Sequence, residues 1–396
     1  MSELEELIQK LCPNGVEFVP LWSVTAWDKR FNGVNRSMQS KIVPHKYYLS
    51  AEFDRVERSF GDVLYLPTGV TQQKRYTTVE LAGDYLSEGE IICIPWGGTP
   101  NVKYYKGKYV TGDNRIATSL DTNKLSNKYL YYVLQNSIDL ISSFYRGAGI
   151  QHPNMAAVLS IMIPLPPLPV QREIVRILDS FTELTAELNK KLEEELAARR
   201  KQYEFYRDKL LTVDTAITQK PISEIAEIST GSSNTDDAVK NGKYPFYVRS
   251  QEPLAKNEYE YDEEAIITAG DGVGVGKVFH YVNGKYALHQ RAYRIHPSDE
   301  GIDGRFLYHY FIAKFPLYIA KQMYQGSVPS IRRPMLNKFE VSIPPIETQK
   351  RIVNILDNFD AICSDLNIGL PAEIEARQRQ YEYYRDKLLT FKELEG

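Results

Sequence analysis

The sequence predicts an α+β protein in which two mixed α/β globules are separated by two long antiparallel helices that form a coiled coil. The first observation is a repeat: RRKQYEFYRDKLLT at residues 199–212 returns as RQRQYEYYRDKLLT at 377–390, with 11 of 14 positions identical. The second is the extent of this repeat, because 170–212 and 348–390 align without a gap and share 23 of 43 residues. The constant spacing indicates an internal pseudo-two-fold symmetry.

The predicted order along the chain is globule, helix, globule, helix, with boundaries at 1–169, 170–212, 213–347 and 348–396. Both globules contain β-like runs. Each also has a Gly-Lys-Tyr segment, YYKGKYV in the first and YVNGKYA in the second, that predicts a hairpin turn. The globules are similar in kind and not in detail, which indicates an old duplication that has since diverged.

The central helix is predicted to begin near Val170, because the prolines of IPLPPLP just before it cannot lie inside a helix. From Gln171 to Leu211 it extends about 60 Å. Its apolar side chains, at steps of three, four and occasionally seven, are Ile174, Ile177, Phe181, Leu184, Leu188, Leu192, Leu196, Tyr203, Tyr206 and Leu210. A helix of this length needs a partner to bury such a stripe. The second copy supplies it, although Gly369 and Pro371 predict a kink or break there.

Composition predicts a soluble cytoplasmic protein with more than one domain. A chain of 396 residues is too long for one ordinary core, and 43% hydrophobic with 25% charged residues is typical of globular proteins. The N-terminal MSELEELIQK is acidic, unlike a signal peptide, and no run approaches the roughly 20 apolar residues of a membrane span. Cys12, Cys93 and Cys363 are widely spaced and are expected to be free thiols.

The two copies of the repeat agree best in a segment rich in charged residues, although exposed charged positions normally change freely in evolution. The globules differ while the helices agree, so we expect the helices to present the same surface to two copies of one partner protein. The predicted docking residues are Tyr203, Glu204, Tyr206, Arg207 and Lys209 in the first copy, and Tyr381, Glu382, Tyr384, Arg385 and Lys387 in the second. A recent duplication, or charges that serve pairs within the chain, would explain the same agreement.

The whole chain, with PLPPLPVQREIVRILDSF and the twin QYEFYRDKLLT and QYEYYRDKLLT, resembles the specificity subunits of type I restriction–modification systems. The resemblance implies that each globule is a target-recognition domain for one half of a split, asymmetric DNA sequence, and that the helices set the distance between the halves. It also implies two modification subunits, which use S-adenosylmethionine, and two restriction subunits, which use ATP and Mg. No cofactor is expected in this chain itself.

Net charge says little about DNA binding, since residues 1–169 carry +1 and 213–347 carry −2. Local patches that mix Arg or Lys with Gln, His, Asn or Tyr are better candidates, because Arg reads guanine and Gln or Asn reads adenine. The predicted DNA-binding residues are Lys74, Arg75, Lys103, Tyr104, Lys106, Lys108, Arg146, Gln151, His152, Lys285, His289, Gln290, Arg291, Ser330, Arg332 and Arg333. Tyrosine beside lysine is also common on ordinary solvated strands.

Other features of the chain favour neither a nucleotide site nor catalysis. AGDGVGVGK at 269–277 has Lys277 where a dinucleotide fingerprint needs glycine, lacks the ending of a phosphate loop, and predicts a turn between strands. The six histidines show no metal-ligand spacing. An enzyme that acts by itself would need an amino-methylation motif or a nucleophile–base set, and neither is evident. A purely helical scaffold would leave both globules without a role.

Overall fold

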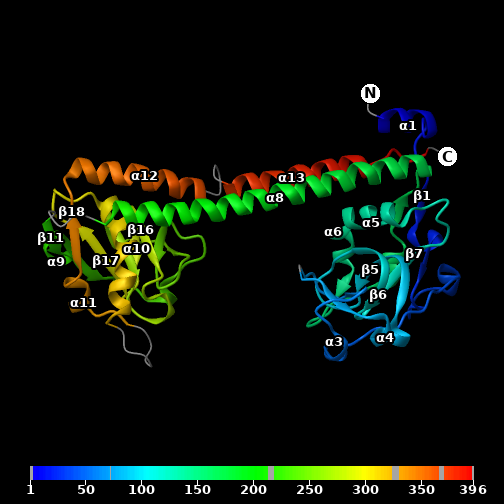
Figure 1. The fold of residues 1–396 in the computed structure, drawn as a ribbon, viewed down its shortest axis with the longest axis horizontal. Helices are drawn as coiled ribbons and strands as arrows, with labels where there is room; N and C mark the ends of the chain where they lie inside the picture. The colour runs from blue at the N-terminus through cyan, green and yellow to red at the C-terminus, as the bar shows by residue number, and fades with distance from the viewer. Residues whose placement is uncertain (1–2, 72, 213–217, 323–329, 365–369, 395–396) are drawn as a thin grey trace. The chain divides into compact units, whose positions relative to one another are not determined.

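The computed structural model describes residues 3–71, 73–212, 218–322, 330–364 and 370–394. The chain divides into two compact units, described here separately (Figure 1). Unit 1 comprises Met1–Leu188 with Ala376–Gly396, and unit 2 comprises Asn189–Glu375. Among the described residues, no helix is long and apolar enough to cross a membrane.

Unit 1 is built on a six-stranded sheet with the order β2-β7-β5-β6-β3-β4. Its strands are β2 (Thr25–Trp27), β3 (Val63–Leu66), β4 (Arg75–Thr77), β5 (Ser87–Pro95), β6 (Lys103–Thr111) and β7 (Asn114–Ser119). The β3–β6 pair is parallel and the other neighbours are antiparallel. Buried side chains of β5, such as Ile92, join those of helix α5 (Asn127–Asn136), such as Tyr129, in one apolar core.

Smaller elements complete unit 1. They are α1 (Glu3–Leu11), β1 (Phe18–Pro20), α2 (Leu21–Val24), η1 (Arg36–Gln39), α3 (Ser50–Val56), α4 (Val79–Ala82), η2 (Gly83–Tyr85), α6 (Ile138–Ser143), β8 (Tyr145–Arg146), β9 (His152–Pro153), α7 (Met155–Leu159) and β10 (Met162–Pro164). The two ends of the chain meet here, because the Val16 amide donates to the Lys392 carbonyl at 2.9 Å. Cys12 and Cys93 are buried free thiols, whereas the side chain of Cys363 lies outside the described part.

Unit 2 repeats the sheet with the equivalent order β12-β17-β15-β16-β13-β14 and one equivalent parallel pair, β13–β16. The strands are β12 (Ala226–Thr230), β13 (Tyr244–Tyr247), β14 (Leu254–Lys256), β15 (Tyr261–Ala269), β16 (Phe279–Leu288) and β17 (Ala292–Pro297). The other elements are β11 (Thr218–Pro221), α9 (Ile222–Ile225), η3 (Thr235–Asp237), η4 (Gly272–Gly274), α10 (Gly304–Ala320), α11 (Arg333–Asn337) and β18 (Glu340–Ile343). The shared topology supports the predicted relation between the globules.

The predicted Gly-Lys-Tyr hairpin turns are wrong. Gly107 lies inside β6 and Gly284 inside β16, and both strands continue through them. Their φ angles of 139° and 127° are of the kind that glycine adopts easily, so each glycine distorts its strand without reversing it. By contrast, the glycine-rich run does form a turn between β15 and β16, with Gly272–Gly274 as the short helix η4.

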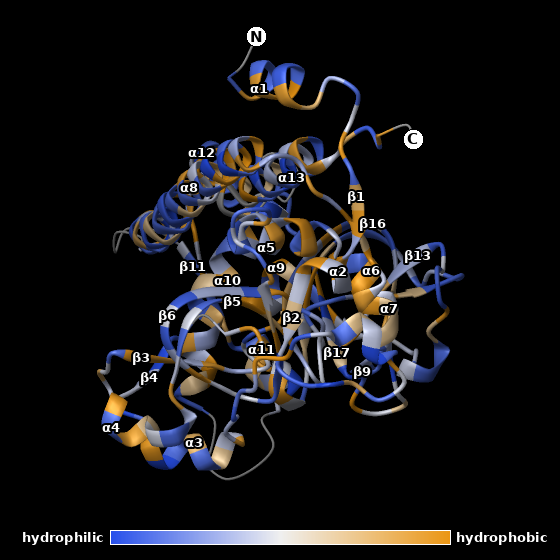
Figure 2. Cartoon of the chain, turned by 90° about the vertical axis from the view of Figure 1, so that its right-hand side faces the viewer, coloured by the Kyte–Doolittle hydropathy of each residue, from blue (hydrophilic) through white to orange (hydrophobic). Residues whose placement is uncertain are grey.

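The repeated segments form the long helices. Helix α8 (Leu168–Leu210) has 43 residues and is continuous. In unit 1 it runs antiparallel to α13 (Leu370–Leu389), with the Phe181 ring stacked on Tyr384 and the Thr182 hydroxyl 3.2 Å from that of Tyr381. Figure 2 shows hydrophilic and hydrophobic residues mixed on α8, α12 (Ile346–Ser364) and α13.

In unit 2, the C-terminal part of α8 runs antiparallel to α12. Tyr206 stacks on Phe359, while Leu211, one residue beyond α8, shares a core with Ile352 and Leu356. The predicted antiparallel pairing is therefore confirmed within each unit. Helix α12 ends at Ser364 and α13 begins at Leu370. The predicted kink residue Gly369 lies outside the described residues, and Pro371 is the second residue of α13, where proline is tolerated.

Candidate functional sites

The first copy of the repeated helical surface lies in unit 2, and at least three of its five predicted docking residues make contacts within the chain. Tyr203 packs against the core of the unit, and burial raises its pKa to about 12. Tyr206 stacks on Phe359 with ring centroids 5.7 Å apart. Arg207 donates to Asp208 at 2.9 Å and lies over the Tyr203 ring. Tyr206 therefore joins the two helices, Tyr203 packs on the core of the unit, and Arg207 makes its contacts within α8.

The second copy lies in unit 1 and is used in a similar way. The Tyr381 hydroxyl meets Thr182, and Tyr384 stacks on Phe181 with centroids 5.7 Å apart. Arg385 donates to the Asn136 side chain of α5 at 2.9 Å, and only 14% of its side chain is exposed. The repeated tyrosines and arginines thus have intrachain roles, as the alternative interpretation of the repeat expects.

What remains exposed in both copies is a different helical face, which we call the outer stripe. Its members are Glu204, Phe205, Asp208 and Lys209 in the first copy, and Glu382, Tyr383, Asp386 and Lys387 in the second. The spacing of one and four residues places each set on one side of its helix. Phe205 is 61% exposed and Tyr383 is 62% exposed, so each stripe offers one aromatic ring among charges. The ring positions were not among the predicted docking residues, although the sequence repeats an aromatic there.

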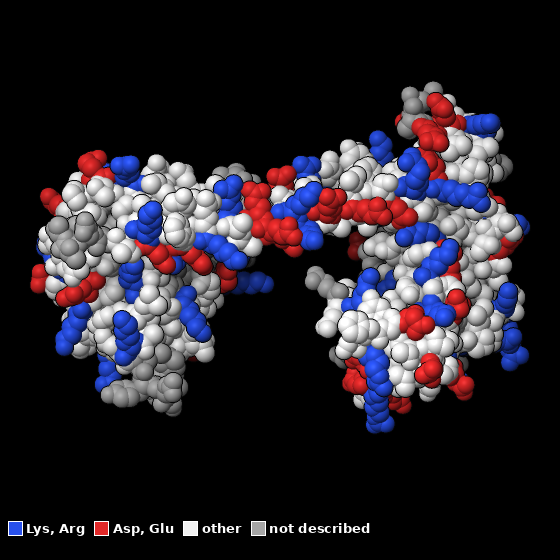
Figure 3. All heavy atoms as spheres, viewed as in Figure 1, with Lys and Arg blue, Asp and Glu red and all other residues white. Residues whose placement is uncertain are grey.

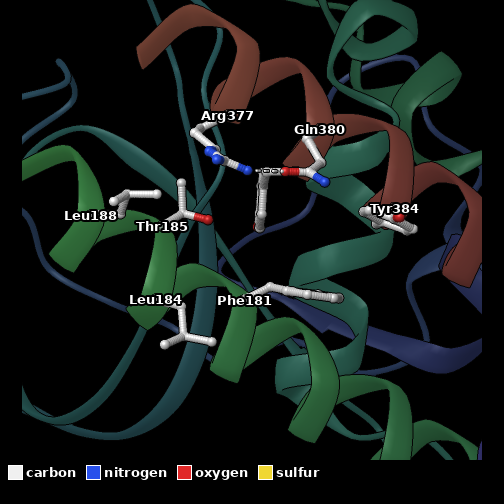
Figure 4. A pocket seen from close by; sticks show the side chains of 8 residues that line it. Phe181, Leu184, Thr185, Leu188, Arg377, Gln380 and Tyr384 are labelled. Atoms are coloured by element: carbon white, nitrogen blue, oxygen red, sulfur yellow. Dashed lines mark hydrogen bonds between the residues drawn. The ribbon is translucent and has the colours of Figure 1, made fainter. Parts of the chain in front are cut away.

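A hollow of about 220 Å³ lies between α8 and α13 in unit 1 (Figure 4). It is lined by Phe181, Leu184, Thr185, Leu188, Arg377, Gln380, Tyr381 and Tyr384. Figure 4 shows Leu184, Thr185 and Leu188 along one helix, with Arg377 and Gln380 opposite. The lining is mostly apolar and Leu184 is 62% exposed, so the helix pair leaves apolar surface accessible at this point.

Several predicted DNA-binding residues of unit 1 are occupied by the fold itself. Arg75 donates to Glu57 at 2.6 Å and also pairs with Asp54, and these bonds raise its pKa. The Lys103 ammonium donates to backbone carbonyls, including that of Thr68 at 2.9 Å. Burial lowers the pKa of this lysine. Tyr104 donates to Glu90 at 2.6 Å, and burial raises the pKa of its hydroxyl.

The remaining candidates in unit 1 fall into two groups. Lys74, Lys106 and Lys108 are at the surface, where Lys106 lies 3.9 Å from Glu90 and Lys108 lies 3.7 Å from Asp62. Arg146, Gln151 and His152 belong to the second group, in and beside the two-stranded pair of β8 and β9. The β8–β9 pairing brings Arg146 and His152 of this second group next to each other.

A tryptophan is the centre of that group. The Trp96 carbonyl lies 2.7 Å from His152 Nδ1, and the Lys29 ammonium lies over the indole at 5.1 Å. The Gly98 amide donates to the Gln151 carbonyl at 3.1 Å. We call Lys29, Trp96, Arg146, Gln151 and His152 the Trp96 cluster. Trp96 and Lys29 were not predicted, because no charge pattern surrounds Trp96 in the sequence.

Unit 2 has its own loop cluster at the equivalent place. Asp271 accepts from Arg249 at 2.6 Å and from Arg291 at 3.4 Å, and it pairs through its backbone with Ser330. Gln290 donates to the Asn234 side chain. We call Arg249, Asp271, Gln290, Arg291 and Ser330 the Asp271 cluster. Arg249 and Asp271 were not predicted, since each lies far from Arg291 in the sequence.

The other candidates of unit 2 differ in accessibility. His289 is buried, and burial together with Arg249 and Arg291 lowers its pKa. Lys285 is on β16, with its ammonium 3.9 Å from the Asp262 carboxylate. Arg332 and Arg333 are exposed just after Ser330 and begin α11.

The two clusters occupy corresponding positions in the shared topology. The residue after β5, Trp96, donates its amide to the Asp113 carbonyl at 2.9 Å, just before β7. The residue after β15, Gly270, donates to the Arg291 carbonyl at 2.8 Å, just before β17. The side chains differ, however: an indole with a lysine and a histidine in one unit, two arginines on a carboxylate in the other. On the face drawn in Figure 3, Lys, Arg, Asp and Glu are intermixed on each unit.

Comparisons with known proteins agree with this organisation. The family model of the type I restriction modification DNA specificity domain matches residues 47–198 and 217–376. The specificity subunit of the Escherichia coli type I restriction enzyme EcoR124I/EcoR124II is 31% identical, over 99% of this chain and 98% of that one. A putative type I restriction enzyme specificity subunit of Haemophilus influenzae is 32% identical, over 78% of this chain and 84% of that one.

Solved structures show the same fold at lower identity. The crystal structure of the type I S subunit from M. genitalium has a TM-score of 0.52 and 16% identity, covering 95% of this chain and 96% of that one. A chain from a structure on complex assembly of the type I R-M system has a TM-score of 0.63 and 14% identity, covering 96% and 98%. Because the family model matches both halves and a relative aligns from end to end, the chain belongs to the specificity subunits of type I restriction–modification systems, the DNA-recognition components that are not themselves catalytic.

Proposed function

We propose that each unit reads one half of a bipartite, asymmetric DNA target, and that the helices set the distance between the halves. The observation that carries this proposal is the pair of loop clusters. They occupy corresponding positions on sheets of the same strand order, yet present different side chains. One scaffold with two different surfaces suits the recognition of two different short sequences.

The chemistry of the clusters suits direct readout of base edges. Arg291 is 58% exposed and keeps its guanidinium near Asp271, which orients it while leaving donors for guanine. Gln290 is exposed next to Arg291 in unit 2, and Gln151 is exposed in unit 1. A glutamine amide can pair with adenine. Lys29 and Arg146 are suited to phosphate. The Trp96 cluster thus combines a group that specifies bases with groups that position the DNA backbone, and the Asp271 cluster offers two groups that specify bases.

The helices are suited to a spacer of constant length. Helix α8 is continuous over 43 residues, which corresponds to about 65 Å. The two ends of its apolar stripe pack into the cores of the two units, so that the helix does not depend on DNA for stability.

The outer stripes are the proposed docking surfaces for two modification subunits. Each presents an exposed aromatic ring, a residue type enriched in protein interfaces, with charged neighbours of the kind found at an interface rim. Two copies of one surface call for two copies of one partner. By family resemblance the modification subunits bring S-adenosylmethionine, and two restriction subunits bring ATP and Mg; the specificity chain itself would need no cofactor.

The methylation motif of the assembled complex tests the proposal. Cells that express this chain with its modification subunit should carry methylated adenines in one split motif with a constant gap. Arg291→Ala should relax the bases of one half only, at about 1–3 kcal/mol for the contacted position. Lys29→Ala, by contrast, should weaken binding to all sequences equally. A motif that is continuous, or one in which Arg291→Ala alters both halves, would contradict the assignment of one half to each unit.

A further inference from the structure

The helix that opens each copy of the repeat has a fully buried glutamine near its N-terminus. In unit 1, Gln171 accepts the Ser126 amide at 2.9 Å and donates to the carbonyls of Lys124 and Pro166, both at 2.7 Å. Ser126 is the N-cap of α5, and Pro166 belongs to the segment that leads from the sheet into α8. One side chain therefore ties the spacer helix to a helix of the globule and to the connection between them.

Unit 2 contains the same arrangement. Gln349 accepts the Asp303 amide at 2.9 Å and donates to the carbonyls of Gly301 and Pro344, both at 2.8 Å. Asp303 is the N-cap of α10, which is the counterpart of α5. Gln171 and Gln349 both have an exposed fraction of 0%. We call the contacts of Gln171 the first joint and those of Gln349 the second joint.

A second contact lies two helical turns further along each spacer helix. Asp179 accepts from the Tyr132 hydroxyl at 2.5 Å and lies 3.2 Å from the Lys128 ammonium, both on α5. Asp357 lies 2.7 Å from His309 Nε2 and accepts from Arg305 at 2.9 Å, both on α10. Each globule is thus held at two points along its helix, which prevents it from turning about either one.

The aspartates bond to side chains of the globules, whereas the glutamines bond to backbone groups. The side chains that contact the aspartates have changed between the globules, from tyrosine and lysine to histidine and arginine. The glutamines, by contrast, bond only to backbone groups. A joint made with the backbone keeps its geometry whatever side chains the globule carries, so the recognition surface can diverge while the attachment stays the same.

We propose that Gln171 and Gln349 are positioning residues that hold each globule at a constant angle on its spacer helix and thereby set how strictly the gap in the DNA target is measured. The proposal rests on the proposed function of the helices as a spacer. A helix can transmit a distance to the DNA only if the globule does not swing on it, because a small rotation at the joint displaces a distant loop cluster by several ångströms. Loss of the amide removes three hydrogen bonds to backbone groups that are buried or partly buried, so an apolar replacement loosens this attachment.

The test uses the full chain assembled with its modification subunit. Gln171→Met and Gln349→Met keep the volume of the side chain and remove its hydrogen bonds, and Gln9→Met changes an exposed glutamine of α1 as the control. Methylation is measured on duplexes that carry both half-sites with the natural gap and with one base pair more or fewer. In the variant that carries both Gln171→Met and Gln349→Met, we expect the preference for the natural gap to fall roughly tenfold. Small misplacements of binding groups relative to their target have effects of this order or larger. The bases required in each half should be unchanged.

Each outcome separates the possibilities. If the glutamines serve only folding, the melting temperature falls and methylation declines equally at all three gaps, which overturns the proposal. If the methionine variants do not assemble, Asp179→Ala is measured instead, because it removes the second contact of unit 1 at a side chain that is 40% exposed. The proposal then requires that Asp179→Ala weaken the preference for the natural gap. A complex without substitutions that shows no gap preference would overturn the spacer function itself, and not merely the joints.

Discussion

Phe181 of α8 stacks on Tyr384 of α13 with ring centroids 5.7 Å apart and an interplanar angle of 17°. The corresponding residues of the other repeat copies, Phe359 and Tyr206, form the same stack at 5.7 Å and 23°. Each copy of the repeat therefore contributes its phenylalanine to one helix pair and its tyrosine to the other. Both copies accordingly keep the same spacing along the chain between this phenylalanine and this tyrosine.

Removal of either stack should destabilise the unit that contains it. Tyr384→Ala should lower the free energy of unfolding of unit 1, and Tyr206→Ala that of unit 2, by about 1 kcal/mol for the aromatic pair. Phe205→Ala is the control, since its ring is 61% exposed and should change stability by less than about 0.5 kcal/mol. Denaturant unfolding followed by fluorescence measures all three. If Phe205→Ala lowered the free energy of unfolding as much as the other two variants, the stacks would not contribute more than an exposed aromatic ring.

The outer stripes should govern how many modification subunits bind. Phe205→Ala with Lys209→Glu should remove one subunit, because it deletes the exposed ring and reverses a neighbouring charge. Adding Tyr383→Ala with Lys387→Glu should remove the second. Native mass spectrometry counts the subunits, and Lys190→Glu, at an α8 side chain that is 76% exposed, is the matched control. Full assembly of the quadruple variant would place the docking surface elsewhere.

An insertion in α8 should widen the gap of the DNA target. Four residues after Leu188 add about 6 Å, close to the rise of two base pairs, and make a little more than one turn, so the helix faces keep roughly their directions. The half-sites should stay the same while the gap grows by about two base pairs. Two residues inserted at the same place turn the helix by about half a turn and should impair assembly instead. An unchanged gap in an active four-residue variant would contradict the spacer function.

The second contact of unit 2 should make that unit sensitive to acid. Burial lowers the pKa of His309 below its ordinary 6.5, and hydrogen bonding to Asp357 opposes this only in part. The stability that the neutral ring contributes is present above the unfolded pKa and is lost as pH falls through the folded pKa. His309→Gln should therefore reduce the loss of stability between about pH 7 and pH 5. Denaturant midpoints measured across this range test it, with Tyr308→Phe as a control that removes a neighbouring hydroxyl.

The repeat by itself determined the helices and their direction of pairing. A hydrophobic period depends on neighbours three and four residues away, so the sequence alone identified the apolar stripe that includes Phe181 and Leu184. The same period does not reveal which exposed residues remain free. Tyr384 and Arg385 were predicted to dock a partner, but they contact Phe181 and Asn136, residues more than 200 positions away.

Turns and loop clusters were decided by the tertiary structure. Gly107 was predicted as part of a hairpin turn, yet β6 continues through it because β5 pairs with β6 on both sides of Gly107 along the strand. Arg75 and Lys103 were predicted to bind DNA from their sequence context, which did not reveal that Arg75 donates to Glu57 and Lys103 to the Thr68 carbonyl. Trp96 carries no signal in the sequence. The physical reason is common to all of these cases: local periodicity is encoded by adjacent residues, whereas a side chain is free or occupied according to the partners that folding brings from distant parts of the chain.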